Sequence, residues 1–171
     1  MHARDPLGRA VAYAIALLEQ GAGIAETAAR AGLAFESQIG PHLRHVIEHY
    51  DALLSGLDRG VIDYDRRCRE RALERDPVLA RGRCATLAEG FSARLAQPWP
   101  ESLVVAIDGG LAGDDRYVST STPLRELLFV AGHAVHHYAL LRLLLQQRGV
   151  ILPESIGKAP ATLRHEREQR A

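Results

Sequence analysis

Two histidines lie four residues apart in the segment 132–138, which reads Gly-His-Ala-Val-His-His-Tyr. His133 and His137 belong to the longest apolar stretch of helical character in the chain. On an α-helix, residues i and i+4 lie one above the other on the same face, so two imidazoles at this spacing can bind one metal ion. The spacing therefore indicates a metal site, and the alternative is a pair of hydrogen-bonded histidines in the protein core.

A helical wheel of this stretch places both histidines on its apolar face. His133 and His137 lie about 40° apart when each residue turns by about 100°. The same sector holds Glu126, Val130, Leu140 and Leu144, whereas Arg142 falls on the opposite side. An imidazole that points into a core needs a hydrogen-bond partner or a metal to offset its desolvation.

A second group of histidines supplies candidates for a third ligand. His42, His45 and His49 follow Pro41 within the segment 41–50, and all three fall within about 60° on a helical wheel. Six of the eight histidines thus lie in two short helical segments. Helical bundles build metal sites from side chains on facing helices, so this clustering favours the metal interpretation.

Helical periodicity predicts four long helices that position these groups. The first covers 6–20 and extends to 31 if Gly21 and Gly23 are tolerated; the second begins at Ile39 or Pro41 and ends before Gly56. The third covers 77–96, and the segment 64–75 is partly helical.

The last long helix has the clearest boundaries. Thr122 suits the N-cap, Pro123 the first turn and Gly149 the residue past the end, which predicts a helix over 123–148. Two short strands, 103–107 and 116–119, flank a turn rich in Gly and Asp and predict a β-hairpin before it. A short charged helix follows from Ala161.

We therefore expect an all-α protein: a four-helix bundle with a small β-hairpin insertion before the last long helix and a short C-terminal helix. The 171 residues are expected to form a single domain, 1–171.

Composition excludes some classes of function. Lys plus Arg and Asp plus Glu number 21 each, so no global basic charge favours nucleic-acid binding. No apolar run approaches the roughly 20 residues of a membrane span, because Arg142 interrupts the stretch 140–145. The apolar run 11–18 near the N-terminus has helical spacing and is interpreted as helix rather than as a secretory signal. Cys68 and Cys84 lack the spacing of a zinc site and suit free thiols in a cytoplasmic protein. We expect neither nucleic acid nor membrane as a partner of this protein.

The two histidine segments resemble the DinB-like (YfiT-like) metalloprotein family. The run 133–137, His-Ala-Val-His-His, resembles the family's paired motif in the last helix, although Tyr138-Ala139-Leu140 stands where Arg-Gly-Gln often follows. The run 39–45, Ile-Gly-Pro-His-Leu-Arg-His, resembles the second-helix motif with His45 at the ligand position. The resemblance covers about residues 6–149 and implies a four-helix bundle whose ligand triad is His45, His133 and His137.

The resemblance also implies a divalent metal ion. Imidazole ligands suit zinc, nickel, copper and iron, so Zn, Ni or Fe are the expected choices. The wheel of the second helix centres its apolar face away from His45, with His42 and His49 nearer the apolar edge. His45 is the candidate by motif; His49, the first alternative, or His42 could replace or join it.

Some neighbouring charged residues could assist such a site. Five arginines, Arg66, Arg67, Arg69, Arg71 and Arg75, could clamp a carboxylate or phosphate near the metal. Glu70 and Glu74 lie among them, so a solvated, self-paired helix face is the alternative. Glu126 lies about 10 Å along the helix axis from His133, which is too far to bind the same ion, so it could only support the metal ligands indirectly. The alternative is that its carboxylate stabilises the N-terminus of the helix. Tyr138 and Trp99 are expected to pack, and neither cysteine has the spacing of a nucleophile.

Two functions follow from this pattern. Family members include bacterial transferases and isomerases that use low-molecular-weight thiols, so the resemblance implies a metal-dependent transferase or a hydrolase-like enzyme. In such an enzyme the metal activates a thiol or water against a small electrophile, so its partner would be a small-molecule thiol or electrophile. Homodimerisation is compatible with the family. The alternative is a non-catalytic metal-binding or interaction protein, whose ion is structural or sensory. A catalyst leaves a coordination position open, whereas a fourth protein ligand such as His49 or Glu48 closes a structural site.

Overall fold

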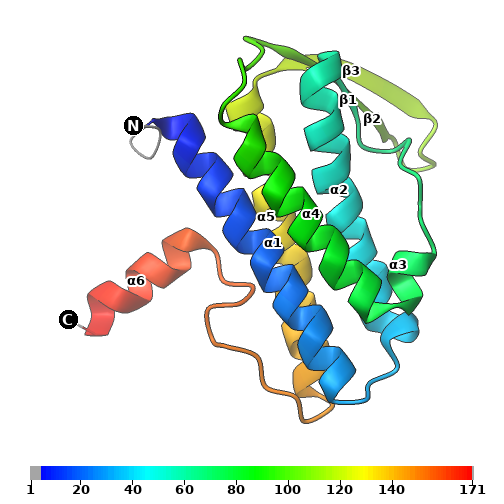
Figure 1. The fold of residues 1–171 in the computed structure, drawn as a ribbon, viewed down its shortest axis with the longest axis vertical. Helices are drawn as coiled ribbons and strands as arrows, with labels where there is room; N and C mark the ends of the chain where they lie inside the picture. The colour runs from blue at the N-terminus through cyan, green and yellow to red at the C-terminus, as the bar shows by residue number, and fades with distance from the viewer. Residues whose placement is uncertain (1–4, 171) are drawn as a thin grey trace.

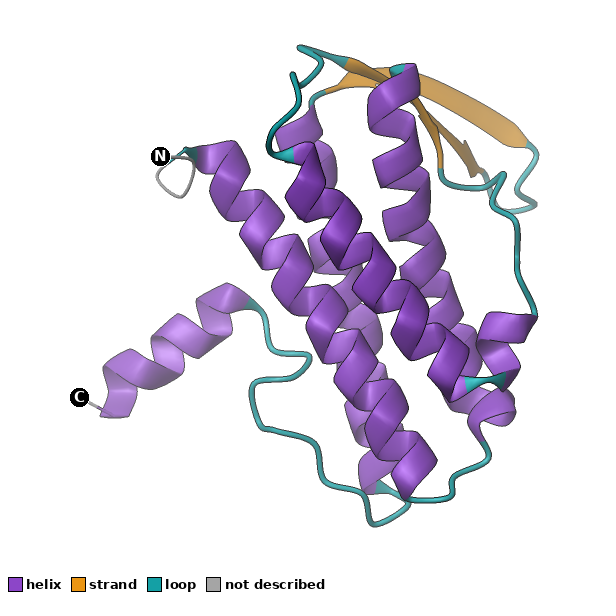
Figure 2. Ribbon diagram, viewed as in Figure 1, coloured by secondary structure: helices purple, strands orange, loops and turns teal. Residues whose placement is uncertain are grey.

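The computed structural model describes residues 5–170, which are mostly helical and include one small three-stranded sheet. In chain order the elements are α1 (Pro6–Arg30), η2 (Phe35–Ile39, a π-helical turn), α2 (Gly40–Arg59), β1 (Val61–Asp63), α3 (Ala72–Arg75), α4 (Pro77–Arg94), β2 (Leu103–Gly109), β3 (Asp115–Ser121), α5 (Pro123–Gln146) and α6 (Pro160–Arg170). Figure 2 shows that the strands lie together at one end of the helices.

The four long helices pack lengthwise around one apolar interior. Helix α1 contacts α4 and α5, and α2 contacts the same two helices (Figure 1). The largest side chains of the interior come from different helices, including Tyr50, Phe91 and Tyr138. The faces of α2 and α5 therefore meet in the interior, and this contact positions the histidine segments.

Helix α1 continues unbroken to Arg30, so Gly21 and Gly23 do not end it. Gly21 has a packing role, because a Cβ built there would lie 2.5 Å from the hydroxyl oxygen of Tyr138. That hydroxyl donates a 2.9 Å hydrogen bond to the carbonyl oxygen of Leu17. The glycine thus lets α5 approach α1, and the prediction that Tyr138 packs in the interior is confirmed.

The expected end of the second helix before Gly56 is wrong. Helix α2 runs on to Arg59 and ends at Gly60, which adopts the left-handed conformation with φ of 72°. A Cβ at Gly56 would lie 2.4 Å from Cγ1 of Ile62, so this glycine admits the strand that follows the helix. Close packing outweighs the modest helical cost of a glycine here.

The predicted hairpin is present, but it belongs to a larger sheet. Strands β2 and β3 pair antiparallel from Leu103 opposite Ser121 to Gly109 opposite Asp115. Strand β1 adds to β2 in parallel, with Ile62 opposite Val105. Three residues are too short a segment for alternation to stand out in the sequence, so the hydrophobic pattern does not predict β1.

Helix α5 begins as predicted and ends slightly early. The Thr122 hydroxyl accepts from the Arg125 amide at 3.3 Å, Pro123 occupies the first turn, and the helix ends at Gln146. Within residues 5–170, α5 is the one helix long and apolar enough to cross a membrane by length and composition. It packs against α1 and α2.

The segment between α5 and α6 packs on the core through the buried side chains of Leu152 and Ile156, whereas α6 itself does not. Helix α6 begins at Pro160, one residue before the predicted start, and none of its residues is buried. Lys158 bridges Glu154 and Glu166 at 2.7 Å each, which fixes the start of α6 relative to the preceding loop. Figure 1 shows α6 projecting away from the long helices.

Candidate metal centre

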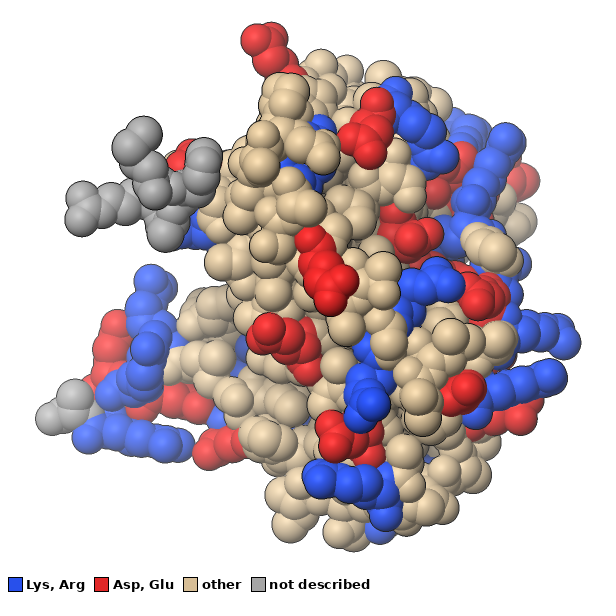
Figure 3. Space-filling view, viewed as in Figure 1, with Lys and Arg blue, Asp and Glu red and all other residues tan. Residues whose placement is uncertain are grey.

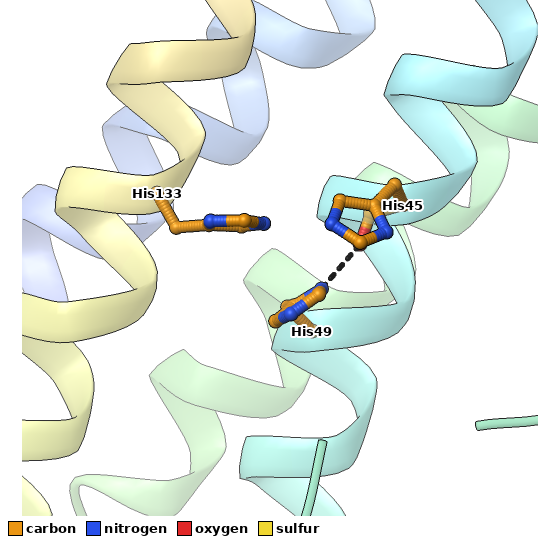
Figure 4. Close-up of side chains that lie close together, drawn as sticks. All are labelled: His45, His49 and His133. Carbon is orange, nitrogen blue, oxygen red and sulfur yellow. Dashed lines mark hydrogen bonds between the residues drawn. The ribbon is translucent and has the colours of Figure 1, made fainter. Parts of the chain in front are cut away.

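Helices α2 and α5 bring three imidazoles to one point. His45 and His49 lie one turn apart on α2 and face His133 of α5 (Figure 4). One ring nitrogen of each lies within 4.8 Å of the other two. The ring centroids of His49 and His133 are 4.3 Å apart, and those of His45 and His133 are 4.9 Å apart. We call His45, His49, His133 and the neighbouring His137 the histidine cluster.

His137 lies beside this triple, with its ring centroid 4.8 Å from that of His45 and 4.6 Å from that of His133. Its Nδ1 is 2.9 Å from Nδ1 of His42, so one of these two imidazoles donates a hydrogen bond to the other. His42 therefore supports His137 from α2, and the Nε2 atom of His137 is left for the cluster. The three imidazoles whose nitrogens converge are therefore the predicted His45 and His133 and the alternative His49, while the predicted His137 lies beside them by ring-centroid distance.

The tautomer of His49 follows from its hydrogen bond within α2. Its Nδ1 lies 2.7 Å from the carbonyl oxygen of His45, which can only accept, so Nδ1 carries the proton (Figure 4). Nε2 then presents a lone pair to the cluster. A histidine that donates one ring N–H to a backbone carbonyl while the other nitrogen binds metal is the common arrangement in metalloproteins.

The histidine cluster also contains a buried nitrogen with no partner. Nε2 of His133 is buried and makes no hydrogen bond with the described residues. A buried polar atom without a partner costs free energy, and coordination to a cation would satisfy it. The donor set therefore fits a divalent metal whose ligands are imidazole nitrogens.

The electrostatic environment keeps these imidazoles neutral. Burial lowers the pKa of His45 to about 2 and that of His49 to about 3, and the positive charge of Arg67 contributes to both shifts. Burial, followed by the neighbouring His133, lowers the pKa of His137 to about 4. Burial also lowers the pKa of His133. Neutral imidazole is the form that coordinates metal, so these imidazoles have the protonation state that a metal ligand requires at neutral pH.

A loop arginine enters the same space. Nη1 of Arg67, in the segment between β1 and α3, lies 3.2 Å from Nδ1 of His45 and 3.1 Å from Nε2 of His49. It also lies 2.5 Å from Nδ1 of His49, but that nitrogen already donates to the His45 carbonyl and cannot accept. Of the five arginines predicted to assist the site, Arg67 is the one whose guanidinium reaches hydrogen-bond distance of these imidazoles.

Arg75 and the acidic residues Glu70 and Glu74 of this segment pair with groups from other elements. Arg75 binds Glu36 at 2.8 Å, whereas Glu70 and Glu74 pair with Arg83 of α4 and Arg44 of α2. The alternative of a self-paired helix face is thus replaced by pairs between elements. A single helix wheel could not show this, because the segment 64–71 is not helical.

An aromatic wall closes one side of the cluster. The ring of Tyr64 stacks on His49, with centroids 5.4 Å apart and planes 17° apart, and Phe129 stacks on His133 at 6.2 Å and 20°. Tyr64 and Phe129 contact each other at 5.3 Å. Tyr64 lies 15 residues from His49 in sequence, so no local spacing pointed to it.

Glu126 anchors this wall from the start of α5. Its side chain is fully buried and accepts hydrogen bonds from the hydroxyl of Tyr64 at 2.9 Å and the hydroxyl of Ser121 at 2.5 Å. Nη1 of Arg125 donates a further hydrogen bond to Oε1 of Glu126 at 2.8 Å. Glu126 therefore orients Tyr64, which in turn packs against His49.

The remaining candidates lie away from the cluster. Both cysteines are free; Cys84 is buried among the helices, and burial raises its pKa to about 12, whereas Cys68 is exposed. Trp99 packs on the core, and the Arg94 guanidinium lies 5.1 Å above its ring. Acidic and basic side chains are interspersed over the face seen in Figure 3.

Comparison with known proteins yields a partial sequence match. A protein named FK506-binding protein 5, from Rhizopus delemar, is 30% identical over 111 residues. The match includes 64% of this chain, and the chain spans 28% of that relative's length. No protein-family model matches the chain, and no solved structure matches it.

Proposed function

We propose that this protein binds a divalent metal ion, Zn, Ni or Fe, through His45, His133 and His137, with His49 as a further ligand from α2. The observation that carries the proposal is the convergence of α2 and α5, which brings one ring nitrogen each of His45, His49 and His133 within 4.8 Å of one another, with the ring of His137 beside them and Nε2 of His133 without a partner. Bound there, the metal would supply a Lewis acid that polarises a ligand or lowers the pKa of water.

We further propose that the chain is a single-domain, DinB-like four-helix bundle, in which α1, α2, α4 and α5 are the four helices. Support comes from the order of the helices and from one ligand segment in the second long helix and one in the last. The Rhizopus relative is matched over 28% of its length, so the FK506 binding stated in its name contributes nothing to this proposal.

The catalytic form of the proposal is a transferase or hydrolase-like enzyme that acts on a small thiol or electrophile. The accessibility of the cluster favours this form. His45, His133 and His137 are half-buried, so solvent reaches part of each residue, whereas His49 lies deeper. Arg67 at the rim offers a positive charge to an anionic group on such a substrate.

The alternative is a non-catalytic site in which the ion stabilises the packing of α2 on α5 or senses metal availability. The specific observation in its favour is the fourth imidazole, because four protein ligands close a zinc site. We also propose that the protein is cytoplasmic and forms a homodimer. The free thiols of Cys68 and Cys84 support the cytoplasmic location.

Elemental analysis of the purified protein tests metal binding. We expect about one divalent metal per chain in the wild type and a loss of most of it in the double variant His133→Ala, His137→Ala. His165→Ala is the matched control, because His165 is exposed on α6 and outside the cluster. Equal metal content in all three proteins contradicts the proposal. Thiol-transfer assays with small electrophiles on the loaded wild type then separate the catalytic form from the alternative.

A further inference from the structure

The guanidinium of Arg67 and a divalent metal ion would compete for the same imidazole nitrogens of the histidine cluster. The guanidinium of Arg67 donates to nitrogens of His45 and His49 and so uses lone pairs that a metal ion needs. Arginine stays protonated at all ordinary pH values and has no lone pair to offer a metal. A divalent cation and Nη1 of Arg67 therefore cannot share these imidazoles.

Arg67 is also incompletely satisfied where it lies. Its Nε is buried without a hydrogen-bond partner, and Nη1 lies 2.5 Å from the protonated Nδ1 of His49. Burial lowers the pKa of Arg67, and the nearby carboxylates of Glu48 and Asp65 oppose this shift. The position of Arg67 on the imidazoles therefore leaves one of its donors unsatisfied and another against a protonated nitrogen.

Glu48 offers a complementary position for the displaced guanidinium. Its side chain is buried, and Oε1 accepts from the Glu70 amide at 2.7 Å, whereas Oε2 is buried with no hydrogen-bond partner. Glu48 and Arg67 line one cavity of about 550 Å³, together with Asp63, Cys68 and Glu70. Arg67 and Glu48 thus line the same cavity with opposite charges, and each has one buried polar atom without a hydrogen-bond partner, although Nε of Arg44 lies 4.0 Å from Glu48 Oε2.

We infer that Arg67 is a built-in competitor of the metal: its guanidinium binds His45 and His49 until a divalent cation displaces it toward Glu48. This inference rests on the proposed metal site and adds its regulation. Arg67 satisfies imidazole lone pairs before the metal enters, and its departure gives the buried carboxylate of Glu48 a hydrogen-bond donor in addition to the 4.0 Å ion pair with Arg44.

Competition of this kind weakens the apparent affinity for metal. The apparent dissociation constant equals the intrinsic one divided by the fraction of molecules whose site is open. If the open form makes up about a tenth of the population, removal of Arg67 tightens metal binding about tenfold. A residue that merely helped to hold the metal would change the affinity in the opposite direction.

Zn²⁺ affinity, measured by competition with a chromophoric chelator, tests the inference on the full chain. We expect Arg67→Met, which keeps much of the side-chain volume, and Arg67→Ala to bind Zn²⁺ about tenfold more tightly than the wild type. Arg66→Ala is the matched control, since it removes the same charge from the adjacent, exposed residue that pairs with Asp63. Circular dichroism identifies any variant that fails to fold, and Arg67→Met then decides the result.

Glu48→Gln distinguishes displacement from simple charge repulsion. We expect it to weaken Zn²⁺ binding severalfold when Arg67 is present and to have little effect in the Arg67→Met background. The inference is overturned if Glu48→Gln changes Zn²⁺ affinity equally in the wild-type and Arg67→Met backgrounds. It is also overturned if the Arg67 variants bind Zn²⁺ no more tightly than the wild type. Either result leaves the metal site intact. Absence of Zn²⁺ binding in the wild type and every variant instead overturns the proposed function and the inference with it.

Discussion

The imidazole of His49 and the phenol ring of Tyr64 stack with their planes 17° apart, and the hydroxyl of Tyr64 donates to the fully buried Glu126. This relationship links three elements, because His49 lies on α2, Tyr64 follows β1, and Glu126 begins the last long helix. Hydrogen bonding thus fixes the tyrosine, and the tyrosine fixes one wall of the histidine cluster.

Loss of the Tyr64 hydroxyl should destabilise the protein without removing the stacked ring. We expect Tyr64→Phe to lower the free energy of unfolding by about 1–3 kcal/mol, because Glu126 stays buried with one donor fewer. Tyr117→Phe is the control, since Tyr117 is exposed and its hydroxyl lies 3.4 Å from Asp115. Urea unfolding measures both, and equal small losses would show that the Glu126 hydrogen bond is unimportant.

The close approach of α1 and α5 predicts opposite effects at two glycines of one helix. We expect Gly21→Ala to destabilise the protein, because its methyl group would meet the Tyr138 hydroxyl at 2.5 Å and disturb that group's bond to Leu17. At Gly23 a Cβ meets nothing within 4 Å, so Gly23→Ala should stabilise by about 0.5–1 kcal/mol through helix propensity. Thermal melting distinguishes the two, and a stabilising Gly21→Ala would contradict this packing.

His42 should act on metal binding through His137. We expect His42→Ala to weaken Zn²⁺ binding about 10- to 100-fold, the usual effect of removing a hydrogen-bond partner of a ligand. His49→Ala should weaken it more, because His49 offers its own Nε2 to the ion. Isothermal titration with Zn²⁺ measures both variants. Unchanged affinity in His42→Ala would mean that His137 does not coordinate the metal and would leave His45, His49 and His133 as the ligands.

Acid should unfold the metal-free protein more readily than its net charge alone predicts. The pKa values of His45, His49 and His137 fall from 6.5 to about 2, 3 and 4 on folding, chiefly through burial. Below pH 6.5 the unfolded chain therefore binds protons that the folded chain does not, and stability decreases as pH falls toward 4. Urea midpoints between about pH 7.5 and 5 in the presence of a chelator measure the slope.

A variant of the deepest histidine checks the origin of that slope. His49→Phe keeps a ring that can stack on Tyr64 but cannot titrate, so the decrease in stability below pH 6.5 should become shallower. His165→Ala serves as the control because His165 is exposed on α6. The same slope in all three proteins would assign the acid sensitivity to groups outside the cluster.

Local sequence signals determined most of the helices. Thr122 and Pro123 mark the start of α5, Asp76 accepts from the amides of Val78 and Leu79 at the start of α4, and the i,i+4 spacing sets His133 above His137. Each of these depends on residues within one or two helical turns, and such short-range geometry is readable from a single chain. The two histidine segments could therefore be recognised from their spacing alone.

Tertiary structure decided which groups meet. Helix α2 extends through Gly56 because the following strand packs against it. Strand β1 pairs with β2, and Tyr64 and Arg67 contact the histidines. These last contacts join residues that are distant in sequence. A wheel describes one helix in isolation, so it could rank His45 against His49 but could not show that both reach His133. Only the packing of α2 on α5 brings them together, because side-chain convergence depends on the distance and crossing of two helices rather than on spacing within either.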